Sequence, residues 1–334
     1  MAATVRPANR QDLDRLEAMI AHVDPGMLTM PQTREAMASR IEKSIAAFAR
    51  PSSPPENECY FLVMEEDGQL LGVGSLFTNL GFERPFYSYR ISRDSKLSPE
   101  LNVKVELDLL HLVNDYHGDT ELGTLFIERH ARGGGRGRLL SFARLLLIAA
   151  DPLRFGPRAM AEIRGFTDAE GRSPFWDAVG AKFFLMDYRK ADARSARDHR
   201  FIADLMPRYP IYADLLPEEA RNVIAKPHPD AEPALAMLKS QGFHYNNVVD
   251  IFDAGPSVEA FTDHIDIVRS ATRMSAAEFA AGDAGPRGLV STAAVARFAA
   301  TQFGDGEARS AVLARIGASG VDQVLVYRTP EKRP

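Results

Sequence analysis

The sequence has little cysteine, no excess of positive charge and no long apolar run. Cys59 is the only cysteine among 334 residues, which excludes an intrachain disulfide and disfavours a cysteine-based metal site. The formal net charge is −5, whereas a nucleic-acid-binding protein needs a basic excess for its phosphate contacts. No stretch is long enough to span a bilayer, and the N-terminal residues lack the apolar core of a signal peptide. These absences predict a cytoplasmic globular protein that binds neither nucleic acid nor membrane.

The composition is typical of a globular protein, with 45% hydrophobic and 25% charged residues. A chain of this length buries a sizeable core and accommodates one elaborate domain or two ordinary ones. Cys59 precedes the apolar run Tyr60–Met64, and Trp176 is flanked by Phe175 and followed by Phe184. We therefore expect both Cys59 and Trp176 in the core. No histidine and carboxylate cluster has metal-ligand spacing, and we expect no bound metal.

The most informative motif is the glycine- and arginine-rich segment Arg132–Gly137, with the sequence RGGGRG. It lies between an apolar strand candidate, Glu121–Ile127, and an apolar helix candidate, Arg138–Ala150. Three adjacent glycines allow backbone N–H groups to turn toward one anion, and the positive end of the helix dipole points to the same place. Arg132 and Arg136 add full charges. The motif predicts a site for a phosphate-bearing ligand, and the alternative is a glycine-rich turn with solvated arginines.

Most phosphate loops do not fit this motif. A kinase-type loop requires a lysine, and this loop has none. A dinucleotide-binding loop follows the first strand of a parallel sheet, whereas several antiparallel strand candidates precede this one. An RNA-binding segment of this composition would be repeated. The remaining pattern is Arg-x-x-Gly-x-Gly, met by Arg132, Gly135 and Gly137. It resembles the pyrophosphate loop of GNAT-superfamily acyltransferases, which bind an acyl-coenzyme A.

Periodicity and turn residues predict an α/β (α+β) chain with a mixed, mostly antiparallel sheet flanked by helices. The expected strands are Thr4–Arg6, Tyr60–Glu65, Leu70–Asn79, Tyr87–Ser92, Glu121–Ile127, Ala159–Gly165, Phe243–Phe252 and Gln323–Tyr327. The expected helices are Pro7–Ile20, Arg34–Ala49, Arg138–Ala150, one that begins at Ser173, and Asp230–Gln241. Leu107–Val113 is apolar but of uncertain type. Asp67-Gly68 predicts a tight hairpin turn, and the helix after Ser173 is expected to bury a stripe of Phe175, Val179 and Phe183.

Longer segments resemble one family. The quoted stretches are Glu100–Val103, Thr120–Ser141, Ala161–Gly165, Ser173–Phe184, Phe201–Tyr212 and Val248–Pro256. They are similar to arginine N-succinyltransferase over about Val5 to Pro256, and the similarity fades after about Ala271. The resemblance implies a GNAT-like acyl-CoA N-acyltransferase fold in residues 1–255, with a CoA-binding core at about 60–190 and a second portion at about 200–255. Residues 256–334 are expected to form a small, divergent subdomain.

The resemblance also implies a reaction. It is the transfer of succinyl from succinyl-CoA to the α-amino group of L-arginine, the first step of the succinyltransferase route of arginine catabolism. The amine is expected to attack the thioester directly, with succinyl-CoA as co-substrate and no tightly bound cofactor. Ornithine or another amine, or another acyl-CoA, is an alternative. A further alternative is a non-catalytic partner subunit, and the chain is expected either as a homo-oligomer or beside a paralogous subunit.

Residue roles follow from the same resemblance. His228, between two prolines, matches the proton donor of the family, and histidine both gives and takes protons near neutral pH. Leu125 matches a position that contacts succinyl-CoA, through backbone groups. The residues expected to bind the pyrophosphate are Arg132, Gly133, Gly135, Arg136 and Gly137.

Candidates for the two charged ends of the substrates come from charge alone. A guanidinium requires planar, paired acceptors, and Glu121 and Glu162 lie in adjacent strand candidates. The succinyl carboxylate requires a cation or N–H donors, for which Arg90 and Arg164 are candidates. His117 lies on a polar approach to the strand Glu121–Ile127 and is a further candidate for lining the site.

Overall fold

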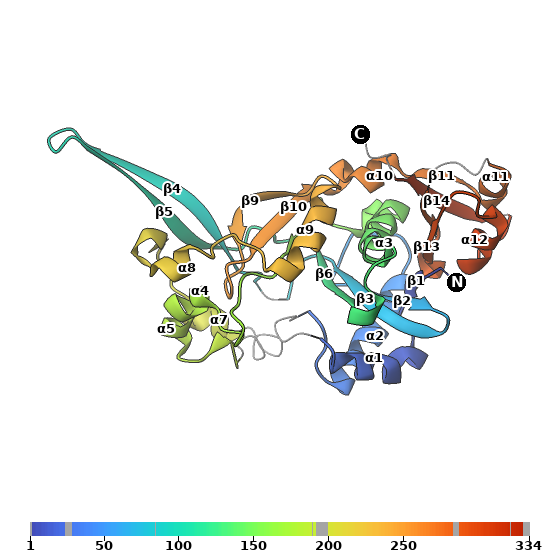
Figure 1. Cartoon of the computed structure of the whole chain (residues 1–334), viewed down its shortest axis with the longest axis horizontal. Coiled ribbons are helices and arrows are strands. Elements are labelled where there is room, and N and C mark those ends of the chain that lie inside the picture. Colours follow the sequence, from blue (N-terminus) through green and yellow to red (C-terminus); the bar gives the residue numbers. More distant parts are fainter. Residues whose placement is uncertain are drawn as a thin grey trace.

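The computed structural model describes residues 2–23, 29–83, 85–188, 190–191, 200–282, 287–320 and 322–329. In this part of the chain the strands form one 14-stranded sheet along an elongated molecule (Figure 1). From one edge to the other they are β11 (Thr272–Ser275), β14 (Gln323–Arg328), β12 (Gly288–Thr292), β13 (Ala300–Phe303), β1 (Thr4–Pro7), β2 (Cys59–Glu66), β3 (Gln69–Phe77), β6 (Thr120–Ile127), β7 (Arg158–Glu162), β10 (Pro256–Phe261), β9 (His244–Val249), β4 (Ser88–Ser98), β5 (Val103–Val113) and β8 (Ile211–Tyr212).

The helices cover the two faces of the sheet and its ends. They are α1 (Leu13–Ile20), α2 (Arg34–Ala49), α3 (Arg136–Ala150), α4 (Pro174–Ala178), α5 (Gly180–Phe184), α7 (Arg200–Leu205), α8 (Glu218–Arg221), α9 (Glu232–Lys239), α10 (Asp266–Ser270), α11 (Ala276–Ala281) and α12 (Arg309–Arg315). Short 3-10 turns lie at η1 (Arg10–Asp12), η2 (Arg129–Ala131), η3 (Pro152–Arg154), η4 (Ala213–Leu215), η5 (Pro229–Ala231), η6 (Thr262–His264) and η7 (Val295–Arg297). None of the described helices has the length and apolar character needed to cross a membrane.

The central strands are buried on both faces, which explains their continuous apolar runs. In β2, Tyr60 and Leu62 pack in the cluster that includes α3, whereas Cys59 and Phe61 pack in the cluster of α1 and α2 on the opposite face. Cys59 is thus a core residue, as predicted. The turn between β2 and β3 has positive φ at both Asp67 and Gly68, as the predicted two-residue hairpin requires.

The predicted helix after Ser173 is interrupted. Ser173 caps α4 through a hydrogen bond from Trp176 N–H, as expected, but α4 ends before Val179 and α5 begins at Gly180. The break shifts the helical register, so Phe184 is buried while Phe183 is 39% exposed. The prediction of a buried stripe that includes Phe183 was therefore wrong, although Trp176 is fully buried as expected.

Other differences concern lengths. The pair β4–β5 is longer than the Tyr87–Ser92 strand predicted, and the uncertain apolar segment is the C-terminal part of β5. The strand expected at Phe243–Phe252 ends at Val249, because the chain turns there into a loop held by the Asp250 carboxylate, which accepts hydrogen bonds from two backbone N–H groups. That turn brings the loop after β9 against the segment that follows β7, where the Gly165 N–H donates to Asp253 at 2.8 Å.

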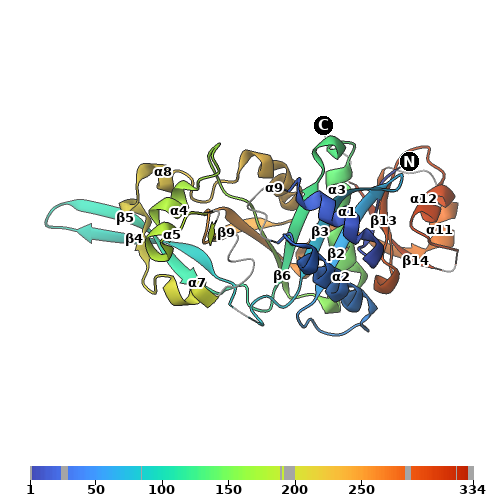
Figure 2. The same ribbon diagram turned by 90° about the horizontal axis from the view of Figure 1, so that it is seen from below.

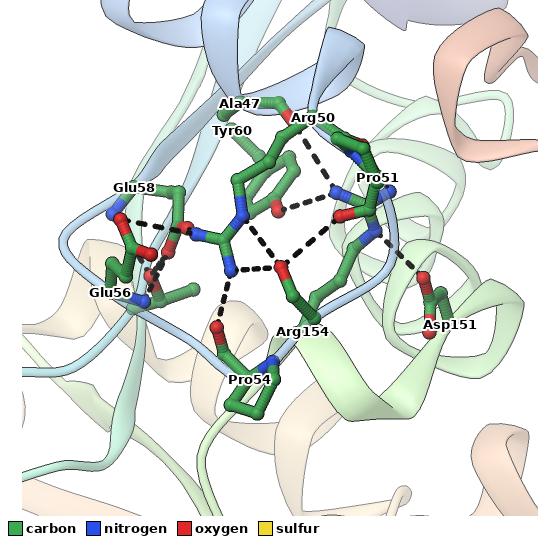
Figure 3. Close-up of polar contacts among 11 residues, drawn as sticks. Ala47, Arg50, Pro51, Pro54, Glu56, Glu58, Tyr60, Asp151 and Arg154 are labelled. Atoms are coloured by element: carbon green, nitrogen blue, oxygen red, sulfur yellow. Dashed lines mark hydrogen bonds and ion pairs between the residues drawn. The ribbon is translucent and has the colours of Figure 1, made fainter.

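A buried polar cluster ties α2 and β2 to the end of α3 (Figure 3). The Arg154 guanidinium donates to the backbone oxygen of Arg50 at 2.6 Å and to Asp151 at 2.8 Å. Arg50 forms an ion pair with Glu58 at the start of β2. The cluster satisfies two arginines that would otherwise be costly to bury, and it fixes α3 against the sheet.

The strands on either side of residue 255 share the same sheet. β10, which begins at Pro256, lies between β7 and β9. The last strands join the body through β13, which pairs with β1. The sheet is continuous across residues 255 and 256. The division of the chain into two parts at this point stays a prediction.

Candidate functional site

The site lies where the central sheet splits. β6 and β7 are the one parallel pair among the described strands, and they are paired only at Thr120 with Ala159 and at Glu121 with Met160. Beyond these residues the two strands diverge. The opening between them is covered by α3 and α9 on one face of the sheet (Figure 1).

A β-bulge in β6 shapes one wall of this opening. Val73 pairs with Phe126 and Ser75 with Gly123, so Thr124 and Leu125 together oppose one residue of β3. Thr124 has φ of 48°, and its N–H and hydroxyl both bond to Thr29 at 2.9 Å. A bulge leaves the extra residue outside the ladder. The backbone at Leu125 is thereby turned from the sheet toward the opening.

A cavity of about 260 Å³ fills the opening. Five of the predicted site residues line it, namely Glu121, Leu125, Arg132, Glu162 and Arg164. Other lining residues that matter for the chemistry are Arg144, Asp230, Asp250 and Asp253. The cavity therefore extends from the glycine-rich loop to the ends of β7 and β9, and it carries charges of both signs.

The glycine-rich loop has the backbone that the sequence predicts. Gly133, Gly134 and Gly135 all have positive φ, and α3 begins at Arg136, two residues earlier than expected. The N–H groups of these glycines and of Gly137 have no hydrogen-bond acceptor in the described part of the chain. Unpaired N–H groups at a helix N-terminus form a cradle for an anion.

The two loop arginines differ in their surroundings. Arg132 is exposed and lines the cavity. Arg136 instead forms an ion pair with Glu66 of the β2–β3 hairpin, with 2.6 Å between Nη2 and Oε2. The tail also reaches this loop, since Gln302 of β13 donates to the Gly134 carbonyl at 3.4 Å. Arg132 is thus the loop cation that faces the cavity, while Arg136 fastens the loop.

Four carboxylates line the same cavity. They are Glu121, Glu162, Asp250 and Asp253, the acid cluster. Burial, together with the charges of Asp250, Glu121 and Asp253, holds the pKa of Glu162 well above its usual value. Burial and Asp253 raise the pKa of Asp250 in the same way. The Glu162 carboxylate has no hydrogen bond or ion pair in the described part of the chain, so the cluster favours a cationic ligand.

The raised pKa of Glu162 has a consequence for stability. A carboxyl group with a higher pKa in the folded state stabilises the fold below its unfolded pKa, and this contribution is lost as pH rises through the folded pKa. We therefore expect Glu162→Gln to raise the melting temperature by a few degrees at neutral pH and to lose this advantage toward pH 4.

Thermal unfolding measured across pH tests this expectation. Glu42→Gln is the matched control, because Arg10 lowers the pKa of Glu42 and its replacement should bring no gain at neutral pH. A Glu162→Gln protein with an unchanged or lower melting temperature at neutral pH would contradict the raised pKa of Glu162 in the acid cluster.

Two further arginines line the cavity. Arg144 of α3 is 1% exposed, and burial lowers its pKa to about 10. Its guanidinium donates to the Gly123 carbonyl at 3.2 Å and to the Ser141 backbone and hydroxyl at 3.4 and 3.3 Å. All three acceptors are neutral, although a guanidinium carries five N–H donors and a full charge. The charge of Glu121 is close enough to raise the pKa of Arg144, against the larger effect of burial. Arg164, at the end of β7, donates to the Thr167 hydroxyl at 3.2 Å.

His228 lies at the edge of the cavity rather than in its lining. Its backbone N–H donates to Arg164 O at 2.8 Å, and the preceding Pro227 forms a bridge with Gly165, so the end of β7 holds this loop. Nδ1 accepts from the Asp230 N–H at 3.2 Å and caps η5. Nε2 has no hydrogen bond in the described part of the chain. The ring is therefore fixed through one nitrogen while the other is available.

Two predicted residues lie outside the cavity. Arg90 forms an ion pair with Asp115 at 2.6 Å and also bonds to the Asn246 carbonyl at 3.3 Å. His117 is exposed in the turn before β6, against Gly81. Neither lines the cavity. No group of three or more histidine, cysteine, aspartate or glutamate side chains in the described ranges is placed to hold a metal ion.

Sequence reasoning did not find Arg144, Asp250 or Asp253. Arg144 sits in an apolar helix run, where an isolated arginine is itself a signal for a buried charge. Asp253 accepts from the N–H groups of Gly165 and Gly255, both at 2.8 Å. A Cβ on Gly255 would come within 2.1 Å of the Ile163 carbonyl. This close approach of two loops could not be read from either segment alone.

Comparisons with known proteins agree on the family. A family model described as the arginine N-succinyltransferase beta subunit matches residues 3–267. The chain is 39% identical over 280 residues to arginine N-succinyltransferase subunit beta of Pseudomonas aeruginosa, covering 84% of this chain and 82% of that protein. It is also 39% identical over 272 residues to arginine N-succinyltransferase of Yersinia pestis, covering 80% of this chain and 77% of the relative.

The structure agrees as well. The solved arginine/ornithine succinyltransferase subunit AI of Pseudomonas aeruginosa superposes with a TM-score of 0.88 at 29% identity, over 99% of both chains. The match thus includes the C-terminal strands, where the sequence similarity had faded. It confirms the predicted mixed, mostly antiparallel sheet with flanking helices. The chain belongs to the arginine N-succinyltransferase family of acyltransferases.

Proposed function

We propose that the chain transfers a succinyl group from succinyl-CoA to the α-amino group of L-arginine by direct attack of the amine on the thioester. The observation that carries this proposal is the cavity between β6 and β7, which is lined both by Arg132 of the glycine-rich loop and by the four carboxylates of the acid cluster. The phosphates of the donor need an anion-binding loop, and the guanidinium of the acceptor needs carboxylates. The relatives are named arginine N-succinyltransferases, which agrees with arginine as the acceptor and succinyl as the group transferred.

The cradle and the bulge support a position for the donor. Its pyrophosphate binds the N–H groups of Gly133, Gly135 and Gly137 together with Arg132. The pantetheine arm then extends between the diverging strands and meets backbone groups at Leu125. In this arrangement the thioester lies beside the Thr124–Leu125 bulge, where the pairing of β6 with β3 is interrupted.

Arg144 and Arg164 are the cations for the succinyl carboxylate. Arg144 is the stronger candidate, because a buried guanidinium with neutral acceptors gains most from an anionic partner. A carboxylate accepts two N–H donors side by side, and in the described part of the chain Arg144 forms three hydrogen bonds with its five donors. Arg90, which is already paired with Asp115, is the weaker choice.

The acid cluster supports a position for the acceptor. A guanidinium binds carboxylates through paired N–H donors, and Glu162 and Asp250 together offer such acceptors beside Glu121. A bound cation would also relieve the repulsion that raises the pKa of Glu162 and Asp250. The chemistry of the site thus complements arginine.

His228 provides the proton transfers. When the amine attacks, a C–N bond forms and the C–S bond breaks, so one proton must leave the nitrogen and one must reach the thiolate. The free Nε2 of His228 can accept the first and donate the second. Oxyanion stabilisation by N–H groups of the bulge would complete the mechanism without an acyl-enzyme.

The test is a thiol-release assay with the purified chain, in which succinyl-CoA and acetyl-CoA are each combined with arginine, ornithine and lysine. The highest turnover is expected with succinyl-CoA and arginine. Ornithine is the alternative acceptor, because the solved relative is called an arginine/ornithine succinyltransferase subunit. No release by the chain alone, but release after addition of a paralogous subunit, would instead support the role of a partner subunit.

A further inference from the structure

The hairpin of β4 and β5 leaves the body of the molecule as a long arm. Figure 1 and Figure 2 show it protruding from one end of the sheet in both views. In the described part of the chain, β4 pairs with β9 only at Tyr89 and Arg90, and β5 pairs with β8 only at Leu109 and Leu110. The outer residues of the arm therefore pair only with each other. A two-stranded hairpin without further support is marginally stable in water.

One face of the arm carries a row of apolar side chains. Alternation along β5 places Val103, Val105, Leu107 and Leu109 on the same face. Val103 is 45% exposed and Val105 is 40% exposed. The intervening residues, Lys104, Glu106 and Asp108, lie on the opposite face. An exposed apolar row on an amphipathic strand indicates a surface that a partner covers.

Among the described strands, none pairs with the outer edge of β5 between Val103 and Asp108. The Asp108 N–H points away from β4, because it donates to the Asp214 carboxylate at 2.7 Å. Backbone groups in an antiparallel pair alternate in direction, so Lys104 and Glu106 direct their N–H and C=O groups to the same outer side. An edge of this kind is a template for another strand.

We propose that β5 pairs antiparallel with β5 of a second copy of the chain, about a two-fold axis at Val105. In this register Lys104 faces Glu106 of the partner subunit, and the symmetry repeats the pair. Val103 faces Leu107 of the partner subunit on the apolar face. The residues with outward backbone groups are those that form the hydrogen-bonded pairs.

The charges select this register. An axis at Lys104 would place that lysine against its own copy, and an axis at Glu106 would place two glutamates together. Only the axis between them, at Val105, makes both charged positions complementary. The sequence VKVEL of Val103–Leu107 is thus self-complementary in both charge and apolar pattern, which identifies a second copy rather than an unrelated protein as the occupant.

Charge reversal in the full-length chain tests the pairing. Lys104→Glu or Glu106→Lys alone places like charges opposite each other twice, and each is expected to weaken the dimer roughly tenfold or more. An equimolar mixture of the two variants restores opposite charges and should associate as well as the unaltered chain. The double variant on one chain should do the same. Sedimentation across a concentration series measures the dimer dissociation constant.

Lys43→Glu, on the exposed face of α2, is the control for a change of net charge and should leave the dimer intact. Unaltered melting temperatures would show that the variants are folded. The proposal is overturned if the unaltered chain stays monomeric, if it associates only with a paralogous subunit, or if both single variants dimerise like the unaltered chain.

Discussion

Replacing His228 with alanine is expected to lower kcat by about two to four decades, the usual contribution of a positioned acid or base. The histidine is held at the end of β7 by its backbone, and Nδ1 is committed to the cap of η5. Nε2 is therefore the nitrogen that can exchange protons with the reacting groups. The measurement is steady-state turnover of succinyl-CoA and arginine, with the affinity for CoA determined separately.

His228→Asn separates the chemical role from the structural one. Asparagine is a good N-cap residue and so keeps η5, but it cannot exchange a proton. Both variants should therefore lose turnover to a similar extent while their affinity for CoA stays within a few fold. Recovery of turnover in His228→Asn would assign the histidine to the cap, and unchanged turnover in both would remove it from the mechanism.

Replacing Arg144 with glutamine is expected to change donor selectivity. Glutamine retains a donor for the Gly123 carbonyl but lacks the charge for the succinyl carboxylate. A hydrogen bond to a charged group contributes about 1.5–3 kcal/mol, so kcat/KM for succinyl-CoA should fall roughly 10- to 100-fold. Acetyl-CoA has no carboxylate, and its kcat/KM should change by less than about threefold.

The ratio of the two donors decides the role of Arg144. An equal loss of kcat/KM with succinyl-CoA and acetyl-CoA would mean that the guanidinium supports the bulge through Gly123 and does not bind the succinyl carboxylate. Arg154→Gln is the matched control, because Arg154 is also a buried arginine but lies outside the cavity lining. It should lower stability without changing the donor ratio.

Local features were readable from the sequence because neighbouring residues alone create them. The turn at Asp67-Gly68 and the cradle at Arg132–Gly137 follow from residues that tolerate positive φ. The central strands and α3 follow from apolar periodicity. The start of the helix after Ser173 was predicted correctly, but the break at Val179 was not. Around this break Trp176 stacks on Phe184 and on Phe252, which is far along the chain.

Only part of the candidate site could be predicted from the sequence. Glu162 and Arg132 could be named from strand alternation and from the loop motif. Asp250 and Asp253 could not, because their place depends on the turn after β9 that brings them against the end of β7. In the sequence, Arg144 is one polar residue in an apolar helix. Only the structure shows that its guanidinium donates to the Gly123 carbonyl of β6.

The sequence by itself determined the family, the anion-binding loop and the order of the central elements, since each depends on contiguous residues with strong local preferences. Only the tertiary structure decided that Arg132 of the glycine-rich loop, the buried Arg144 and four carboxylates line one cavity. The reason is that these groups come from β6, α3, β7 and the turn after β9, and the divergence of two parallel strands brings them together. Long-range pairing of this kind leaves no periodic signal in the chain.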